Sequence, residues 1–252
     1  MDKNKIRNVN IIRVIQETPS IRTIYFFDKE CSKAKPGQFV MVWIPGIDEL
    51  PMSLSQIQKD GYSSITIKPW QEGSKALYDL EMAENIGIRG PYGNGFKLID
   101  GSALLIGGGT GLAPMIPLSQ KLIENKTKIK LVMGARTKTE LVFLERAKKI
   151  IPKKNIITVT DDGSVGIKGQ TPDVVSKILD QEDINCVYVC GPKPMIKKIF
   201  EITQLKNTLI QASLETKVNC SVGICGRCNI GEYLLCVDGP VFDRRMIQNS
   251  LK

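Results

Sequence analysis

The sequence predicts three successive parts: an antiparallel β-barrel, a doubly wound parallel α/β domain, and a short C-terminal module rich in cysteine. Three observations predict this order. Short β-rich runs separated by Pro and Gly fill residues 1–98, strand–helix alternation fills residues 99–208, and four cysteines crowd into residues 209–252. The chain of 252 residues is long enough for two modest domains, since a domain commonly holds roughly 100–200 residues.

The barrel is predicted from five short β-rich runs that alternate with turns. The runs span residues 9–15, 21–27, 38–44, 64–68 and 85–89. Runs at this spacing, with Pro and Gly between them, are typical of a small antiparallel barrel.

The second part is predicted from buried strands that alternate with helices. Apolar runs at residues 103–106, 129–133, 156–159 and 186–189 indicate strands, and apolar residues at helical spacing follow each one. In the first helix these residues are Leu112, Met115, Leu118 and Leu122. Such alternation predicts a parallel sheet with helices on both faces.

The third part is defined by cysteines in the pattern C-x4-C-x2-C-x7-C. The first three follow the spacing of a plant-type [2Fe–2S] loop, whose backbone wraps the cluster and directs N–H groups at its sulfurs. Gly223 and Gly226 are the small residues that this close approach requires. The predicted cluster ligands are Cys220, Cys225, Cys228 and Cys236.

Zinc and disulfides are the other interpretations of these cysteines. Structural zinc sites usually pair their ligands in C-x2-C units, and only Cys225 and Cys228 form one. Disulfides need an oxidising compartment, whereas the N-terminus has no apolar signal-peptide core. We therefore expect a cytoplasmic location, and free thiols at Cys31, Cys186 and Cys190.

Composition excludes several kinds of function. Histidine is absent, which excludes Ser–His catalysis, His-ligated zinc or iron, and a Rieske centre. The formal net charge is +9, but the lysines are scattered and no nucleic-acid-binding motif accompanies them. We expect no nucleic-acid partner. No apolar run approaches the ~20 residues of a membrane span, so no membrane attachment is expected.

A glycine-rich turn follows the first predicted strand of the second part. Its residues are Gly107, Gly108, Gly109, Thr110 and Gly111. Glycines there let the backbone approach a pyrophosphate, and the helix that follows directs N–H groups at it. The pattern departs from G-x-G-x-x-G, and Gly134-Ala135-Arg136 replaces the usual ribose-binding acid. Taken alone, the turn is equally consistent with a tight strand–helix connection.

A second glycine turn follows the fourth predicted strand. It contains Cys190, Gly191 and Pro192, and the third strand ends in Thr160-Asp161-Asp162-Gly163. All three turns lie at the carboxyl ends of parallel strands, the edge where ligands bind in doubly wound sheets. Their convergence predicts a nucleotide site at this edge.

Three segments of the barrel are candidate ligand contacts. Residues 51–55 carry hydroxyls that can bind a flavin ribityl chain or phosphate, although a polar strand end is the simpler interpretation. Residues 73–77 offer backbone N–H groups and a hydroxyl suited to a pyrophosphate. Residues 90–96 form a turn-rich boundary segment, for which a surface turn is an alternative.

Read in order, these motifs resemble the ferredoxin–NADP reductase superfamily, in which a flavin barrel precedes a nicotinamide-binding domain. With the cysteines at the C-terminus, the chain most resembles the electron-transfer subunits of type B dihydroorotate dehydrogenases. The resemblance covers essentially the whole chain. Its most specific segments are residues 51–53, 90–93, 107–114, 190–192 and 213–240.

The resemblance implies a role for each motif. The ribityl and phosphate region of FAD would contact Pro51, Met52, Ser53 and Leu54. The isoalloxazine would be lined by Ile67, Lys68 and Pro69, and the FAD pyrophosphate would be bound by Gly73 and Ser74. The nicotinamide nucleotide would face Gly107, Gly109, Thr110, Gly111, Cys190, Gly191 and Pro192. The four tail cysteines would carry the [2Fe–2S] cluster.

The resemblance also implies a relay with a partner. The partner would be an FMN-containing dihydroorotate dehydrogenase catalytic subunit, in a heterotetramer with two copies of each chain. Electrons would pass through the cluster and FAD to NAD⁺, in pyrimidine biosynthesis. A flavin must stand between cluster and nicotinamide, because the cluster exchanges single electrons and nicotinamide takes two as hydride.

Leu50 is a departure from the family, which usually has Arg there to pair with the FAD phosphate. Lys68 or Lys75 could compensate, or the chain could bind FMN instead. The same motifs also fit a reductase subunit of a sulfhydrogenase or a ferredoxin:NADP oxidoreductase, because Arg136 and Lys138 could accept a 2′-phosphate. A zinc-bearing interaction module on an inactive reductase fold is the third interpretation.

Overall fold

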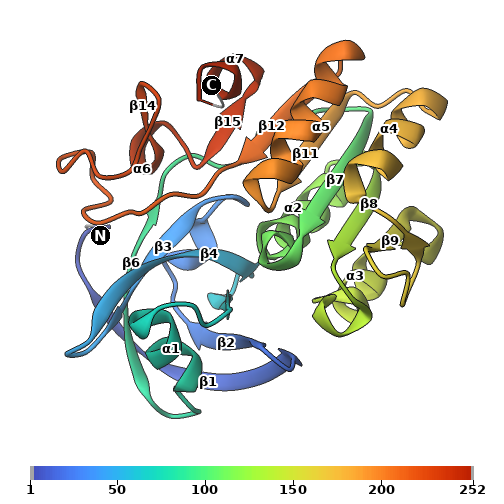
Figure 1. Cartoon of the computed structure of the whole chain (residues 1–252). Coiled ribbons are helices and arrows are strands. Elements are labelled where there is room, and N and C mark those ends of the chain that lie inside the picture. The colour runs from blue at the N-terminus through green and yellow to red at the C-terminus, as the bar shows by residue number, and fades with distance from the viewer. Residues whose placement is uncertain (1–2, 251–252) are drawn as a thin grey trace.

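The computed structural model describes residues 3–250, with side chains to residue 248. An N-terminal barrel is followed by an α/β domain, and the C-terminal segment runs back over the barrel (Figure 1). This arrangement confirms the predicted fold class. Among the described residues, no helix is both long and apolar enough to cross a membrane.

The barrel is closed and antiparallel, in the strand order β1-β2-β5-β4-β3-β6. Its strands are β1 (Arg7–Thr18), β2 (Ile21–Phe27), β3 (Phe39–Ile44), β4 (Asp48–Ile57), β5 (Tyr62–Ile67) and β6 (Asn85–Tyr92). Alternate residues fill the interior, as the two-residue period of a strand requires. Buried examples are Ile24, Phe26, Val40, Ile65 and Ile88. A short 3-10 turn η1 (Cys31–Lys33) and helix α1 (Glu72–Asp79) lie in the connections.

Strand β4 was missing from the predicted strands, which treated residues 51–55 as a segment after a strand. These residues lie inside β4, where Pro51 pairs with Met41 and Ser53 pairs with Phe39 of β3. Proline has no N–H to give to a ladder, and it therefore argued against a strand. Long-range pairing on both sides of β4 outweighs that local signal.

The α/β domain contains a seven-stranded sheet in the order β10-β9-β8-β7-β11-β12-β15, parallel except for β15. Its strands are β7 (Ser102–Gly108), β8 (Lys128–Ala135), β9 (Ile156–Thr160), β10 (Ile167–Lys168), β11 (Cys186–Cys190), β12 (Leu209–Ser213) and β15 (Val241–Asp243). Its chain order reverses between β7 and β11. That reversal is the point at which doubly wound sheets bind ligands.

Helices cover both faces of this sheet. One face packs against α2 (Leu112–Glu124) and α3 (Leu144–Ile150), and the other against α4 (Thr171–Gln181), α5 (Lys193–Leu205) and α7 (Arg244–Ser250). Short 3-10 turns are η2 (Gly109–Gly111), η3 (Lys138–Glu140) and η4 (Lys153–Asn155). Helix α2 also packs against β4, so it lies between the sheet and the barrel (Figure 1).

The sheet continues past residue 208, where the boundary of the cysteine module was predicted. Strand β12 begins at Leu209 and pairs with β11, and β15 pairs with β12 after the cysteine segment. Between them, residues 214–240 contain β13 (Asn229–Ile230), β14 (Tyr233–Leu234) and α6 (Leu235–Asp238). The cysteine segment is therefore a long connection between two strands of the nucleotide domain. The division into three domains stays a prediction.

Candidate functional site

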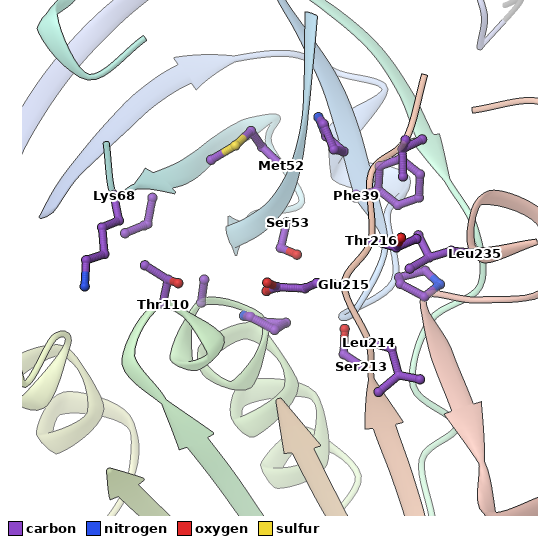
Figure 2. Close-up of a pocket in the computed structure, with 16 residues that line it drawn as sticks. Phe39, Met52, Ser53, Lys68, Thr110, Ser213, Leu214, Glu215, Thr216 and Leu235 are labelled. Atoms are coloured by element: carbon purple, nitrogen blue, oxygen red, sulfur yellow. The ribbon is translucent and has the colours of Figure 1, made fainter. Parts of the chain in front are cut away.

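A cavity of about 280 Å³ lies between the barrel and the α/β domain. Pro51, Met52 and Ser53 of β4 line one side, and Thr110 and the start of α2 line the other. The segment after β12 closes the cavity, and Figure 2 shows the Glu215 carboxylate pointing into its middle. Three parts of the fold thus meet at one small space.

Strand geometry decides which predicted flavin contacts reach this cavity. Pro51, Met52, Ser53 and Lys68 line it, and their contact with a flavin stays a prediction. Leu54 and Ile67 lie instead in the barrel core, each only 1 % exposed. Their side chains pack against other apolar residues, so any ligand contact they make is through the backbone. Their flavin role stays a prediction.

Gly73 and Ser74 lie outside this cavity, in the first turn of α1. The Ser74 hydroxyl accepts hydrogen bonds from the backbone N–H groups of Trp70 (2.8 Å) and Gln71 (2.9 Å). It therefore caps α1. A Cβ on Gly73 would lie 2.4 Å from a carboxylate oxygen of Asp48, which explains the glycine by packing alone. Their predicted contact with the FAD pyrophosphate stays a prediction, and so does the predicted contact of Pro69 with the isoalloxazine.

Of the two lysines considered as replacements for the family's arginine, only Lys68 lines the cavity. It also lines the two neighbouring cavities along the sheet edge, and its side chain is exposed. Lys75 is exposed on α1, and Leu50 packs against the barrel core. Lys68, directly after β5, is thus the one of these two cations that lies at the cavity.

Glu215 is a cavity residue that sequence reasoning did not assign to a site. Its carboxylate faces the cavity space, so the residue is exposed, yet protein surrounds that space. This enclosure raises the pKa of the Glu215 carboxyl above its ordinary value, because a charged group loses hydration there. The only sequence signal was its place in the motif Ser213-Leu214-Glu215, which gave it no role.

A second cavity, of about 570 Å³, adjoins the first and shares Lys68, Thr110 and Glu215 with it. Both glycine turns line it, through residues 108–111 and 191–192. The turns touch: a Cβ on Gly111 would lie 2.4 Å from the Cys190 carbonyl oxygen. Glycine is therefore required for the two sheet-edge turns to pack together.

Cys190 contributes to this edge through its backbone. Its thiol is buried, and burial together with the nearby Glu215 charge raises the pKa of the thiol well above its ordinary range. The thiol is therefore protonated at neutral pH. Gly107 is also internal, because a Cβ there would meet the Leu112 side chain. Of the residues predicted to face a nicotinamide nucleotide, those that line the cavity are Gly109, Thr110, Gly111, Gly191 and Pro192.

A third cavity, of about 610 Å³, continues along the sheet edge to the end of β8. It is lined by Arg136, Glu140 and Asp161, and by the exposed ring of Trp70 from the barrel. Arg136 forms a two-point ion pair with Glu140, at 2.7 and 3.0 Å. Residues from the turns after β7, β9 and β11 thus line one cavity at the same edge of the sheet.

The cysteine loop directs its backbone N–H groups at sulfur. The N–H of Cys225 donates to the Cys220 sulfur at 3.4 Å, and the N–H groups of Val222 and Ile224 also contribute. These donors lower the pKa of the Cys220 thiol to about 6, because they stabilise the thiolate. The N–H of Gly223 acts in the same sense on Cys236.

The other two cysteines form a close pair. The sulfurs of Cys228 and Cys236 are 3.4 Å apart, and both residues are buried. Burial raises the pKa of the Cys236 thiol to about 11. Within residues 3–250, no group of three or more acidic, Cys or His side chains is placed to hold a single metal ion. A cluster with two irons needs no such convergence, because its ligands are shared between two centres.

The loop conformation also fits a cluster. Gly223 and Gly226 adopt positive φ, at 80° and 67°, and a Cβ on Gly223 would lie 2.8 Å from the Val237 side chain. The Ser221 hydroxyl is buried and has no hydrogen-bond partner among the described residues. Inward N–H donors, glycines at positive φ and an unpaired buried hydroxyl are all compatible with a bound sulfur-rich ligand.

Arg89 ties the cysteine loop to the barrel. From β6, it donates to the carbonyl oxygen of Cys220 at 3.0 Å and to that of Asn219 at 3.4 Å. Glu49 of β4 holds the guanidinium at 2.5 and 2.6 Å. Val218 and Leu235 line the first cavity and also pack in one cluster with Cys228 and Cys236. Cys228 and Cys236 therefore pack in the same cluster as side chains that line the cavity.

Two protein families match this chain in the order of its parts. Residues 105–201 match the oxidoreductase NAD-binding domain, and residues 215–248 match the iron–sulfur cluster binding domain of dihydroorotate dehydrogenase B. Among solved structures, a study of an NADH-dependent reduced ferredoxin–NADP oxidoreductase describes a chain with TM-score 0.85 and 24 % identity. The match covers 96 % of this chain and 92 % of the other, and it shows a shared fold.

Relatives match over nearly their full length. One from Thermoplasma acidophilum is 36 % identical over 97 % of this chain and 92 % of its own. One from Methanocaldococcus jannaschii is 38 % identical, over 92 % and 87 % of the two chains. Both are described as probable electron transfer subunits of dihydroorotate dehydrogenase B (NAD⁺). This chain therefore belongs to the family of dihydroorotate dehydrogenase B (NAD⁺) electron transfer subunits.

Proposed function

We propose that this chain passes electrons from an FMN-containing dihydroorotate dehydrogenase catalytic subunit, through a [2Fe–2S] cluster and FAD, to NAD⁺. The reaction would belong to pyrimidine biosynthesis, in a cytoplasmic heterotetramer with two copies of each chain. One observation carries the proposal: the cysteine loop, the interdomain cavity and the glycine-turn cavity adjoin one another and share lining residues. That continuity supports a single path.

The cysteine loop is suited to the first step. Cys220, Cys225, Cys228 and Cys236 would hold the cluster, which supplies one-electron transfer when bound. The loop's N–H groups stabilise negative sulfur, and the Arg89 guanidinium fixes the Cys220 backbone. Packing of Cys228 and Cys236 against Phe39 and Leu235 places the buried half of the proposed metal site beside the cavity, whereas Cys225 is exposed to solvent.

The interdomain cavity is suited to the flavin ring. FAD, when bound, supplies the exchange between single electrons and hydride that cluster and nicotinamide require. Ser53 offers a hydroxyl from β4, and Lys68 offers a cation at the cavity edge. Glu215 faces the same space, and its enclosure there raises the pKa of its carboxyl. The pocket thus combines a hydroxyl, a cation and an acid.

The sheet edge is suited to NAD rather than NADP. The cation that would bind an adenosine 2′-phosphate at this position is Arg136, directly after β8. Glu140 holds that guanidinium in a two-point ion pair and adds its own negative charge to the cavity. A ribose hydroxyl is compatible with this pair, whereas a phosphate dianion would have to compete with Glu140 for Arg136.

Co-expression with a candidate catalytic subunit tests the proposal. The purified complex should contain FMN, FAD and iron with sulfide, and should reduce NAD⁺ when dihydroorotate is added. A Cys225→Ser variant should keep both flavins but lose dihydroorotate-dependent NAD⁺ reduction, since one cluster ligand is gone. Its ability to oxidise NADH with an artificial two-electron acceptor should remain. Unchanged dihydroorotate-dependent activity in Cys225→Ser would exclude the relay.

A further inference from the structure

Two unfavourable features occur together at Ser221 in the cysteine loop. It follows the predicted ligand Cys220 and adopts φ = 66°, the left-handed region that favours glycine. It is only 3 % exposed, and its hydroxyl oxygen has no hydrogen-bond partner among the described residues. A buried hydroxyl without a partner loses its bonds to water and receives nothing in return.

Glycine would avoid both disadvantages at this position. Between Cys220 and Cys228, the two other left-handed positions are both glycine, Gly223 and Gly226. A serine at 221 therefore needs a compensating contact. Its flanking backbone is accounted for by other partners: Arg89 donates to the Cys220 carbonyl, and the Val222 N–H faces the Cys220 sulfur. The side chain alone is left without a partner.

The donors of this loop point at sulfur atoms, so sulfur is the expected acceptor for the Ser221 hydroxyl. Several of the loop's N–H groups already point at the sulfurs of Cys220 and Cys236. We propose that the Ser221 hydroxyl donates a hydrogen bond to a sulfur of the bound [2Fe–2S] cluster and raises its reduction potential. This inference rests on the proposed function, since it needs the cluster to be present.

The direction of the effect follows from charge. Reduction adds an electron to the cluster and makes its sulfurs more negative, so a hydrogen bond from an O–H group becomes stronger. A donor therefore stabilises the reduced form more than the oxidised form. Removing the hydroxyl should lower the midpoint potential and make the cluster a poorer electron acceptor. Ser221 acts here as a tuning residue and takes no part in bond making.

The test compares Ser221→Ala and Ser221→Gly with the parent chain in the complete complex. Redox titration followed by the EPR signal of the reduced cluster should give a lower midpoint potential in both variants. Electron–nuclear double resonance in H₂O and D₂O should show one exchangeable proton coupling in the parent that both variants lack. Ser32→Ala, whose hydroxyl donates to the Lys29 carbonyl in the barrel, is the matched control and should change neither measurement.

The glycine variant separates tuning from folding. Glycine removes the left-handed strain, so Ser221→Gly should assemble the cluster at least as well as the parent, even if Ser221→Ala does not. If Ser221→Gly keeps the parent's midpoint potential and exchangeable coupling, the proposal is wrong while the relay still stands. If the parent complex itself contains no [2Fe–2S] signal, the proposed function fails first.

Discussion

The nucleotide edge and the cysteine loop are built in opposite ways. At the edge, the turns after β7 and β11 each follow a strand and lead into a helix, so residues that are neighbours in the sequence shape each turn. The cysteine loop has little secondary structure of its own, and contacts from more than 100 residues away position it. Arg89 reaches the Cys220 carbonyl across 131 residues, and the Asn94 amide reaches the Asp238 carbonyl across 144. Local sequence therefore encodes the individual turns of the first site, whereas long-range contacts position the whole of the second.

The largest effect is expected where the two glycine turns touch. Gly111→Ala would place a Cβ 2.4 Å from the Cys190 carbonyl oxygen and 2.6 Å from its carbon, and neither backbone atom can yield easily. We expect a loss of about 3 kcal/mol in the free energy of unfolding, together with loss of NADH binding. Chemical denaturation and fluorescence titration with NADH measure the two effects.

Gly109→Ala is the matched control for that change. Gly109 has φ = 56°, but a Cβ there would meet nothing within 4 Å. Only backbone strain remains, so the expected loss is about 1 kcal/mol. Equal losses for the two variants would contradict the idea that close packing of the turns shapes this edge.

The next largest effect is expected from the tie between barrel and cysteine loop. Arg89→Met removes the donor to two carbonyls and leaves Glu49 without its ion pair, so we expect about 2 kcal/mol of destabilisation. The cluster should also be lost faster, which visible absorbance under a chelator would follow. Arg22→Met, which breaks an ion pair with the exposed Glu81, is the control and should leave cluster loss unchanged. Equal rates of cluster loss in the parent and in Arg89→Met would show that the cysteine loop keeps its conformation without the contact to Arg89.

The same contrast explains what the sequence could predict. Cysteine spacing and glycine turns are local patterns, so the metal-binding segment and the nucleotide edge were recognisable. Strand β4 was missed because Pro51 weakened its local signal, and three-residue β15 is a strand only through pairing with β12. Glu215 carries no local pattern at all; the fold brings it into the cavity. The contact between Arg89 and Cys220 joins residues 131 positions apart, so no short sequence pattern can predict it.

A smaller effect is expected on coenzyme choice. Glu140→Gln releases Arg136 and removes one negative charge from the cavity, so the ratio of kcat/KM for NADPH to that for NADH should rise about five-fold, or about 1 kcal/mol. Adding Arg136→Ala should cancel the gain. Glu124→Gln, which alters an ion pair with Lys121 at the end of α2, should leave the ratio unchanged. If the ratio is unaltered in Glu140→Gln, the ion pair between Arg136 and Glu140 does not determine which coenzyme is preferred.

The smallest effect is expected at Glu215, where the two regions meet. Because enclosure raises the pKa of this carboxyl above 4.5, the folded state binds more protons than the unfolded state, and stability falls as pH rises through the folded pKa. Glu215→Gln should remove this dependence and, since the group is partly solvated, gain only about 0.5 kcal/mol at pH 8. Denaturation of the flavin-free chain at pH 4, 6 and 8 measures the slope, with Glu72→Gln on α1 as an exposed control. A variant with the parent's pH slope would mean that solvent in the cavity fully hydrates the carboxylate, and the acid would then be an ordinary surface charge.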